Sequence, residues 1–347
     1  MGVNLNNGFW KARLSGSERG DYERLRAGFS SRQIFGISGL VTTDVAALGR
    51  ICVAALNDDP GLYGVFVGRA QISVGANGRA TVTPQYISCN DKRFNAAVEK
   101  ILQSANNLST DYEKTLFVKD FLGDYVLYDS DCVKQAGELL QGKRKRLDAP
   151  ESFTAYGAIV NRKATCDGIA KAACYLLRRL GVQCVVTNGK RRGSGDPHSW
   201  NIVSIGDACY HLDVTSDLVR KEYYFERTYH YFLTTDAEMY EYFTPDDDGG
   251  IKCDSASDSY YSHNGLRFTR IEALRRYVLD GAYGSTLAVQ YTGDATDKYV
   301  KELLTAAAVR NATADDTYAI HPFAGGKYFV LIKNKFDVPK RRTKGGI

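Results

Sequence analysis

The chain has 347 residues, a formal net charge of +5, 44% hydrophobic residues and 24% charged residues. This is close to an average soluble globular protein, and it excludes a disordered chain, a collagen and a small disulfide-stabilised scaffold. The sequence pI of about 8.6 lies below the values above about 9 that are typical of basic nucleic-acid-binding domains, so we predict no nucleic-acid partner.

The first region, residues 1–105, is predicted to be a small mixed α/β region. Apolar residues recur on one helical face in three segments, which predict helices: Tyr22–Phe29, Thr43–Leu56 and Arg93–Ala105. Between the second and third helices, apolar runs alternate with turn residues and predict strands and a hairpin: Tyr63–Gly68, Ile72–Val74 and Ala80–Tyr86.

The middle of the chain, residues 106–266, carries the densest pattern. Ser109 and Thr110 are suitable caps for a helix over Glu113–Leu122. Residues Gln141–Pro150 are predicted to be an exposed loop that contains four consecutive basic residues. Farther on, the acidic run at residues 246–248 is expected to be an ordinary turn, because it lacks the alternating ligand spacing of a calcium loop.

The last region, residues 267–347, is predicted to be a small α+β appendage. Its expected elements are two helices, an apolar run and a strand pair: Arg270–Leu279, Asp297–Ala308, Ser285–Tyr291, and Tyr318–Ile320 with Tyr328–Ile332. The basic tail, Lys335–Ile347, is expected to be frayed.

Eight cysteines are the unusual count in this composition. None forms a Cys-x-x-Cys pair or a Cys/His cluster at zinc spacing, so no metal site and no cofactor are predicted. An even number permits disulfides, but a chain of this length does not need them. The first ten residues show no signal peptide and no stretch is long and apolar enough to span a membrane. Reduced thiols in a cytoplasmic protein are favoured, with a secreted mature form left open.

One cysteine stands at the start of an amphipathic helix. After Cys166, apolar residues recur on one helical stripe over 169–180, and Gly181 is placed to end the helix. The unpaired amides and the dipole at a helix start favour a thiolate, which is the nucleophilic form. The alternative is a buried structural thiol, because small thiols are among the most buried side chains. Cys174 and Cys184 have no comparable setting and are predicted to be core residues.

A β-hairpin is predicted downstream of this helix. Runs over 198–205 and 208–215 flank Gly206-Asp207, a two-residue turn signal with glycine where a type II′ turn requires it. In that register Asp213 opposes Trp200, so His198 and Asp213 are diagonal neighbours on one face, about 7–8 Å apart at Cα. A slip of one residue would place them on opposite faces.

These three residues match the parts of a cysteine acyl-transfer site. The histidine takes the thiol proton and later protonates the leaving amine. The aspartate orients the ring and stabilises the imidazolium. The backbone amide of Cys166 is placed to face a developing oxyanion. Because such triads are defined in space, the sequence separation of Cys166, His198 and Asp213 is no obstacle.

The same stretch, from Asp111 to Asp217, resembles the transglutaminase-like superfamily. The matching segments are Tyr156–Val160, Cys166–Ala172, Leu180–Val182, His198–Val203 and Tyr210–Thr215. The resemblance implies an α+β fold with a papain/transglutaminase-like core, in which the helix bearing the nucleophile packs on an antiparallel sheet, with small α/β flanking regions. It also implies that Cys166 is the nucleophile, His198 the base and Asp213 the orienting acid.

The resemblance extends more loosely to Leu56–Tyr63 and to Cys253–Phe268, which resemble segments that precede and follow the core in bacterial members. The resemblance to this bacterial multi-part form of the family therefore covers most of the chain. The sequence departs from the family pattern at two positions, where many relatives carry tryptophan and this chain has Cys209 and Ser216. The loss of two aromatic walls puts the family's substrates in doubt for this chain.

The predicted function is thioester-forming acyl transfer on carboxamide or peptide bonds of a protein or peptide substrate, with residues 106–266 as the catalytic core. Cross-linking, deamidation and proteolysis remain open, as does the oligomeric state. Trp200 and Tyr156 are predicted to contact the substrate. The basic residues Lys190–Arg192, just before His198, either attract acidic substrates or are solvated loop charges. The alternative function is a non-catalytic protein-binding module that retains the fold.

Overall fold

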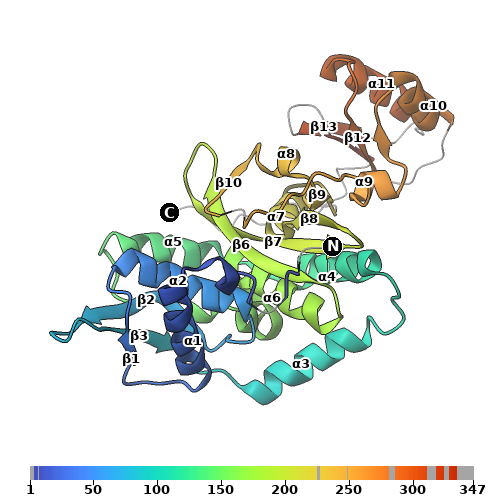
Figure 1. Cartoon of the computed structure of the whole chain (residues 1–347). Helices are drawn as coiled ribbons and strands as arrows, with labels where there is room; N and C mark the ends of the chain where they lie inside the picture. The colour runs from blue at the N-terminus through green and yellow to red at the C-terminus, as the bar shows by residue number, and fades with distance from the viewer. Residues whose placement is uncertain are drawn as a thin grey trace. The chain divides into compact units, whose positions relative to one another are not determined.

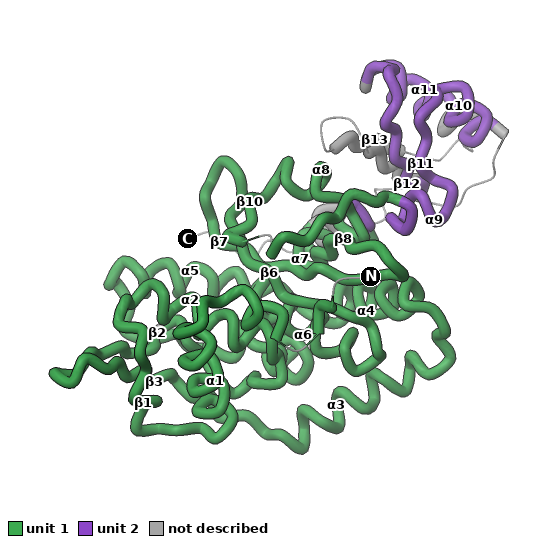
Figure 2. The backbone as a smooth tube through the Cα atoms, viewed as in Figure 1, with its two compact units in different colours: residues 1–227, 231–256 green, residues 228–230, 257–347 purple. Residues whose placement is uncertain are grey.

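A computed structural model describes residues 4–6, 8–224, 227–247, 249–280, 286–310, 318–323 and 328–333. The chain divides into two compact units (Figure 2). Unit 1 contains residues 1–227 and 231–256, and unit 2 contains residues 228–230 and 257–347. Unit 1 therefore holds all of the predicted region 1–105 and most of the predicted region 106–266. The predicted basic tail, Lys335–Ile347, lies outside the described residues.

The N-terminal part of unit 1 combines helices with a small antiparallel sheet (Figure 1). The sheet has the strand order β1-β3-β2, and α1 packs on α2. A capping box between Ser15 and Glu18 begins α1, and the carboxylate of Asp44 caps α2. The elements are η1 (Lys11–Arg13), α1 (Gly16–Ser30), β1 (Ile37–Leu40), α2 (Val45–Asp58), β2 (Val65–Val74), β3 (Ala80–Tyr86) and α3 (Asp91–Gln103).

The next segment leads to the helix that carries Cys166. Its elements are α4 (Asp111–Tyr125), β4 (Leu127–Tyr128), α5 (Ser130–Leu140), η2 (Pro150–Phe153), the π-helix η3 (Gly157–Asn161), β5 (Lys163–Ala164) and α6 (Cys166–Arg179). Thr110 caps α4 as predicted. Helix α5 was not predicted from the sequence; it begins where the Asp129 carboxylate accepts a hydrogen bond from the Cys132 amide. Strands β4 and β5 pair in parallel.

A five-stranded antiparallel sheet forms the centre of unit 1, in the order β10-β6-β7-β8-β9. Its strands are β6 (Cys184–Arg191), β7 (Pro197–Ile205), β8 (Ala208–Leu212), β9 (Phe232–Thr234) and β10 (Phe243–Pro245). Helix α6 packs on one face, where the Asn201 side chain donates to the carbonyl of Ala170 in α6. On the other face Val185, Ile202 and Cys209 join the apolar core of the N-terminal elements. The α+β class, with the cysteine-bearing helix on an antiparallel sheet, is confirmed.

The predicted hairpin is present, but its second strand is shorter than expected. Asn201 pairs with Leu212 and Ile205 with Ala208, in the predicted register, and Gly206 has a φ of +58°. The prediction that the strand continues to residue 215 is wrong, because β8 ends at Leu212 and α7 (Val214–Tyr224) begins two residues later. The reason is local: the Asp213 carboxylate accepts the Ser216 amide and so caps α7.

Unit 1 also contains α8 (Asp236–Met239). Unit 2 has a four-stranded sheet in the order β11-β12-β14-β13. Its elements are α9 (Tyr260–His263), β11 (Arg267–Phe268), α10 (Ile271–Asp280), β12 (Thr286–Tyr291), α11 (Asp297–Arg310), β13 (Tyr318–Phe323) and β14 (Tyr328–Lys333). Leu274 and Val278 of α10 pack with Val289 of β12 and Leu304 of α11 in one apolar core. Each predicted helix and strand of this region is present.

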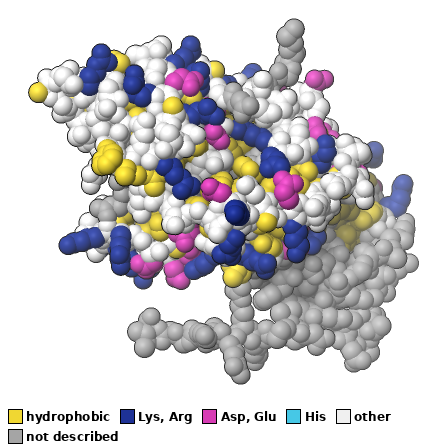
Figure 3. All heavy atoms as spheres, turned by 90° about the horizontal axis from the view of Figure 1, so that it is seen from below, with side chains coloured by type: hydrophobic (Ala, Val, Ile, Leu, Met, Phe, Trp, Pro, Cys, Tyr) yellow, Lys and Arg dark blue, Asp and Glu magenta, His cyan; other side chains and the backbone are white. Residues whose placement is uncertain are grey.

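Three further properties of the structure bear on function. Among the described residues, no helix is long and apolar enough to cross a membrane. The eight cysteines are all free thiols. On the face seen in Figure 3, Lys and Arg side chains are interspersed with Asp and Glu rather than gathered into one basic patch.

Candidate active site

Cys166 is the first residue of α6, and its side chain is half-buried. Thr165 precedes the helix in an extended conformation and, within the described residues, makes no side-chain cap to it. The first amides of α6 and the positive end of its dipole are therefore available to an anion beside the sulfur. This turn supplies both a thiol and donors for a negatively charged oxygen.

A buried polar network holds the turn that carries Cys166. The amide and hydroxyl of Thr165 both donate to the Ser152 carbonyl, at 2.9 and 3.2 Å. The Ser152 hydroxyl in turn donates to the Asp129 carboxylate at 2.7 Å, and the Lys163 ammonium binds the same carboxylate at 3.0 Å. Since Thr165, Ser152 and Asp129 are all buried, these bonds fix the backbone of the turn against η2 and β4.

His198 is the second residue of β7 and is buried. Its ring stacks on Phe243, with centroids 4.4 Å apart and planes 13° apart. Nε2 lies 2.7 Å from Oδ2 of Asp213, so the carboxylate accepts the Nε2 proton and Nδ1 is the nitrogen left for Cys166. The Cys166 side chain lies close enough to the ring to contribute to the raised pKa of His198. In its neutral form the ring carries no proton on Nδ1, which can then accept one from the thiol.

Asp213 lies between β8 and α7 and is buried. Besides the His198 bond, its Oδ2 accepts the Ser216 hydroxyl at 2.6 Å, and its Oδ1 accepts the Ser216 amide at 3.0 Å. Three donors, the His198 ring and the amide and hydroxyl of Ser216, thus stabilise the ionised carboxylate at a buried position. The residue that orients the histidine is itself fixed by the helix it caps.

The two partners shift one another's pKa in opposite directions. Burial alone would lower the pKa of His198, but the negative charge and hydrogen bond of Asp213 outweigh it and raise that pKa to about 10. Burial alone would raise the pKa of Asp213, but the His198 charge and the Ser216 bonds hold it below its usual value. An imidazolium–carboxylate pair is therefore favoured at neutral pH.

Tyr128 is a site residue that the sequence reasoning missed. Strand β4 pairs Tyr128 with Ala164, two residues before Cys166, and Cys166 lies close enough to the Tyr128 hydroxyl to affect its pKa. Burial, followed by the nearby charges of Cys166 and Asp213, raises the pKa of Tyr128, so the phenol stays protonated and can donate. The sequence signal is only a Tyr-Asp pair after one predicted helix, and the chain has 23 tyrosines.

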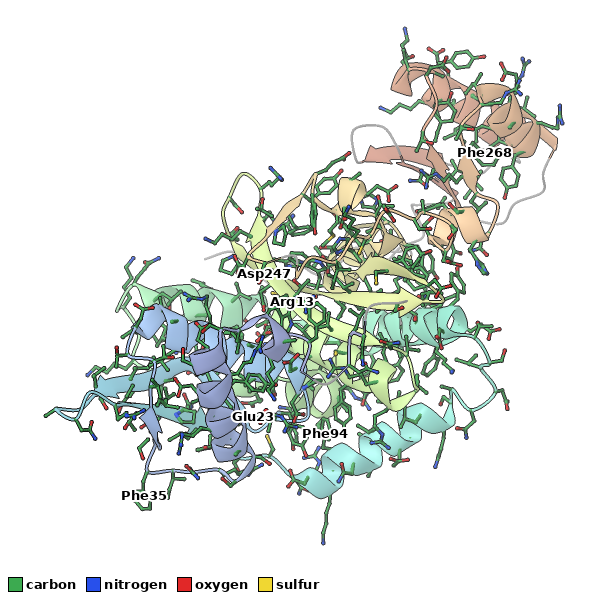
Figure 4. All side chains as sticks on the ribbon, viewed as in Figure 1. Arg13, Glu23, Phe35, Phe94, Asp247 and Phe268 are labelled. Carbon is green, nitrogen blue, oxygen red and sulfur yellow. The ribbon has the colours of Figure 1, made fainter. Side chains whose placement is uncertain are left out.

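The predicted substrate-contact residues lie inside the protein. Trp200 is 1% exposed, and its indole NH donates to Nδ1 of His211 at 3.0 Å. Tyr156 is 7% exposed and stacks with Phe94, which is labelled in Figure 4, at a centroid distance of 6.2 Å. In this structure both residues offer a substrate little surface. Trp200 instead packs beside His198, at a ring distance of 6.0 Å.

His211, Asp236 and Cys253 bring three potential metal-ligand atoms within 4.8 Å of one another. The hydrogen bonds of His211 argue against a metal. Because the Trp200 indole can only donate, Nδ1 of His211 is the acceptor and Nε2 carries the proton. Nε2 donates this proton to Oδ1 of Asp236, which lies 2.8 Å away. Oδ2 of Asp236 also accepts a hydrogen bond from the Cys253 amide at 3.0 Å. The cluster fits a hydrogen-bonded support for Trp200 better than a metal site.

Cys209 and Ser216, the two positions where the sequence departs from the family it resembles, have defined places in the structure. Cys209 is buried in the apolar core shared with the N-terminal elements. Ser216 donates to the Asp213 carboxylate by both its amide and its hydroxyl. Cys209 therefore contributes to packing, and the serine side chain at position 216 adds one donor, its hydroxyl, to the Asp213 carboxylate.

Comparison with known proteins gives partial matches. No protein-family model and no curated protein sequence matches this chain. Among solved structures, a TGase matches 46% of this chain and 47% of its own length, with 18% identity and a TM-score of 0.32. A protein from Cytophaga hutchinsonii, proposed to be a cysteine protease, matches 42% of this chain and 61% of its own length, with 12% identity and a TM-score of 0.27.

Proposed function

We propose that this protein is a cysteine-dependent acyl-transfer enzyme that acts on carboxamide or peptide bonds of a protein or peptide through a thioester. The observation that carries the proposal is the array in which buried His198 is hydrogen-bonded to buried Asp213 and lies close enough to the half-buried Cys166 for the thiol to affect its pKa. A histidine bonded through Nε2 to a carboxylate, with Nδ1 left for a nearby helix-start thiol, is arranged for nucleophilic catalysis.

The geometry supports a two-stage reaction. Nδ1 of His198 holds the proton of the Cys166 thiol, and the Cys166 sulfur forms a bond to the substrate carbonyl carbon. The negative oxygen that develops is bound by the Cys166 amide and the Tyr128 hydroxyl. The C–N bond then breaks, the His198 imidazolium gives its proton to the leaving ammonia or amine, and a thioester remains on Cys166.

The second stage regenerates the thiol. An acceptor amine or a water molecule gives a proton to His198 as it attacks the thioester carbonyl, and the Cys166 thiolate leaves. An amine gives cross-linking, whereas water gives deamidation or proteolysis, according to the bond that was opened. Asp213 holds the ring in one orientation through both stages and stabilises its charged form.

Alkylation tests the nucleophile without any knowledge of the substrate. We expect iodoacetamide at pH 6 to label Cys166 faster than the other seven cysteines, because His198 accepts its proton, and we expect His198→Ala to abolish this advantage. Cys89 is a matched internal control, since it is also half-buried and burial raises its pKa to about 11. Equal labelling of Cys166 and Cys89 would contradict the enzyme proposal and favour a non-catalytic binding module.

The reaction type needs a second experiment. Incubation with a peptide library, scored separately for cleavage, ammonia release and incorporation of an added amine, distinguishes the three outcomes. Cys166→Ser is the control for each score. Any product that persists in Cys166→Ser does not come from this site.

A further inference from the structure

A cation lies at the edge of the catalytic array. Arg191 is the last residue of β6 and is exposed to solvent. It pairs with Phe243 of β10, and its guanidinium carbon lies 4.9 Å from the Phe243 ring centroid. The same ring stacks on His198 at 4.4 Å. Arg191 and the catalytic histidine thus contact one aromatic ring, which fixes the guanidinium close to the site.

Within the described residues, no carboxylate lies within ion-pair distance of Arg191. Other arginines of unit 1 are engaged; for example, Arg144 binds Glu138 and Asp148, and Arg179 binds Glu99. The positive charge of Arg191 also acts on Tyr128. Burial and the charges of Cys166 and Asp213 raise the pKa of Tyr128, and the Arg191 charge opposes that rise. A cation in this position is available to an external anion.

The neighbouring basic residue is differently placed. Successive side chains of a strand point to opposite faces, so Lys190 and Arg191 diverge, and Lys190 lies opposite Pro197 and Thr244 in the ladders. Lys190 is exposed and carries the same charge. It therefore serves as a matched control for the position of the Arg191 charge.

We propose that Arg191 is a specificity residue that selects acyl donors carrying a carboxylate close to the reacting carbonyl, such as a peptide with Asp or Glu beside the bond that is opened. This inference rests on the proposed function, because it concerns the substrate of the same cysteine. The guanidinium attracts the carboxylate, and its planar donors can bind it through two hydrogen bonds. A neutral or basic residue at that place in the substrate gains neither interaction.

A pair of small alkylating agents tests the charge without requiring turnover. Iodoacetate and iodoacetamide form the same bond to the Cys166 sulfur, but only iodoacetate carries a carboxylate. The measured quantity is the ratio of their rate constants at Cys166. We expect Arg191→Gln to lower this ratio about three- to tenfold, the effect of removing one charge several ångströms away in a largely aqueous setting. Arg191→Lys should retain most of the ratio, and added salt should reduce the wild-type ratio.

The control separates a placed charge from a general one. Lys190→Gln should leave the ratio near the wild-type value. An unchanged ratio in Arg191→Gln, or an equal fall in Lys190→Gln, would overturn the proposal. Because both reagents react with any accessible thiol, this test remains informative if Cys166 shows no special reactivity, an outcome that would instead defeat the proposed function.

Peptide substrates provide the second test. Matched pairs that differ only by Asp and Asn beside the reactive residue should show a preference for Asp in the wild type of about three- to tenfold in kcat/KM. Arg191→Glu should reverse this preference. Equal kcat/KM values for the two peptides in the wild type would overturn the proposal while leaving the acyl-transfer reaction established.

Discussion

Gly168 stands two residues after the candidate nucleophile, at a point where the chain leaves no room for a side chain. A Cβ built on Gly168 would lie 2.3 Å from the Ser152 carbonyl oxygen and 3.0 Å from that of Thr154. The Ser152 carbonyl cannot move away freely, because it accepts two hydrogen bonds from Thr165. Replacement of Gly168 by alanine must therefore displace either η2 or the first turn of α6.

The magnitude follows from three contributions. Overpacking of a rigid site costs about 1–3 kcal/mol. Weakening of the Thr165–Ser152 bonds costs about 1 kcal/mol. The better helix propensity of alanine returns about 1 kcal/mol. We expect Gly168→Ala to lower the free energy of unfolding by about 1–3 kcal/mol, and to slow alkylation of Cys166 because the turn that carries it shifts.

Gly137 in α5 provides the control, because nothing lies within 4 Å of a Cβ built there. Gly137→Ala should raise the free energy of unfolding by about 0.5–1 kcal/mol. Urea unfolding followed by tryptophan fluorescence measures both variants, and Trp10 and Trp200, the two tryptophans of the chain, lie in unit 1. If Gly168→Ala were as stable as Gly137→Ala, the inferred close packing of η2 on α6 would be refuted.

Three further predictions concern the catalytic array. Asp213→Asn should lower kcat about 10²–10⁴-fold on a peptide that the wild type converts. It should also move the alkaline limit of activity to lower pH, because the pKa of His198 falls without the carboxylate. An unchanged kcat and pH profile would contradict the orienting role of Asp213. Tyr128→Phe should lower kcat about 10²–10³-fold with little change in KM. The rate of iodoacetamide alkylation of Cys166 should change by less than about threefold, because that reaction forms no oxyanion. A kcat equal to that of the wild type would argue against a donating hydroxyl. His198→Gln should destabilise the protein most at pH 6. Because the pKa of His198 is raised to about 10 in the folded protein, the stability gained from its charge is fully present below about pH 6.5 and is lost as the pH rises through about 10. Urea unfolding at pH 6 and pH 10 measures this difference, and an equal difference at the two pH values would contradict the charged pair.

The sequence determined the parts of the site that depend on local pattern. The helical stripe after Cys166 places the thiol at the start of α6, because the 3.6-residue period defines both the buried face and the first turn. The two-residue turn at Gly206-Asp207 defines the register of β7 and β8, and with it the shared face of His198 and Asp213. These predictions needed only neighbours along the chain.

The error at the end of β8 has a physical cause of the same local kind. The β-branched residues Val214 and Thr215 favour a strand, but the Asp213 side chain gains a capping bond to the Ser216 amide when a helix begins there. The cap and the bond to His198 use different oxygens of one carboxylate. The functional geometry therefore survives although the strand does not.

Only the tertiary structure decided which other residues reach the site. Tyr128 comes beside Cys166 through the parallel pairing of β4 with β5. The sequence had already named Arg191 within Lys190–Arg192, but the pairing of β6 with β10 brings it to Phe243, the ring that stacks on His198. The anchoring of Thr165 by Ser152 and Asp129 likewise joins separate segments. The sequence placed Trp200 correctly on β7, whereas its burial and its bond to His211 depend on strands that pack around it. Local periodicity specifies which face of a helix or strand a side chain lies on. The long-range pairing of strands decides which other residues that face contacts.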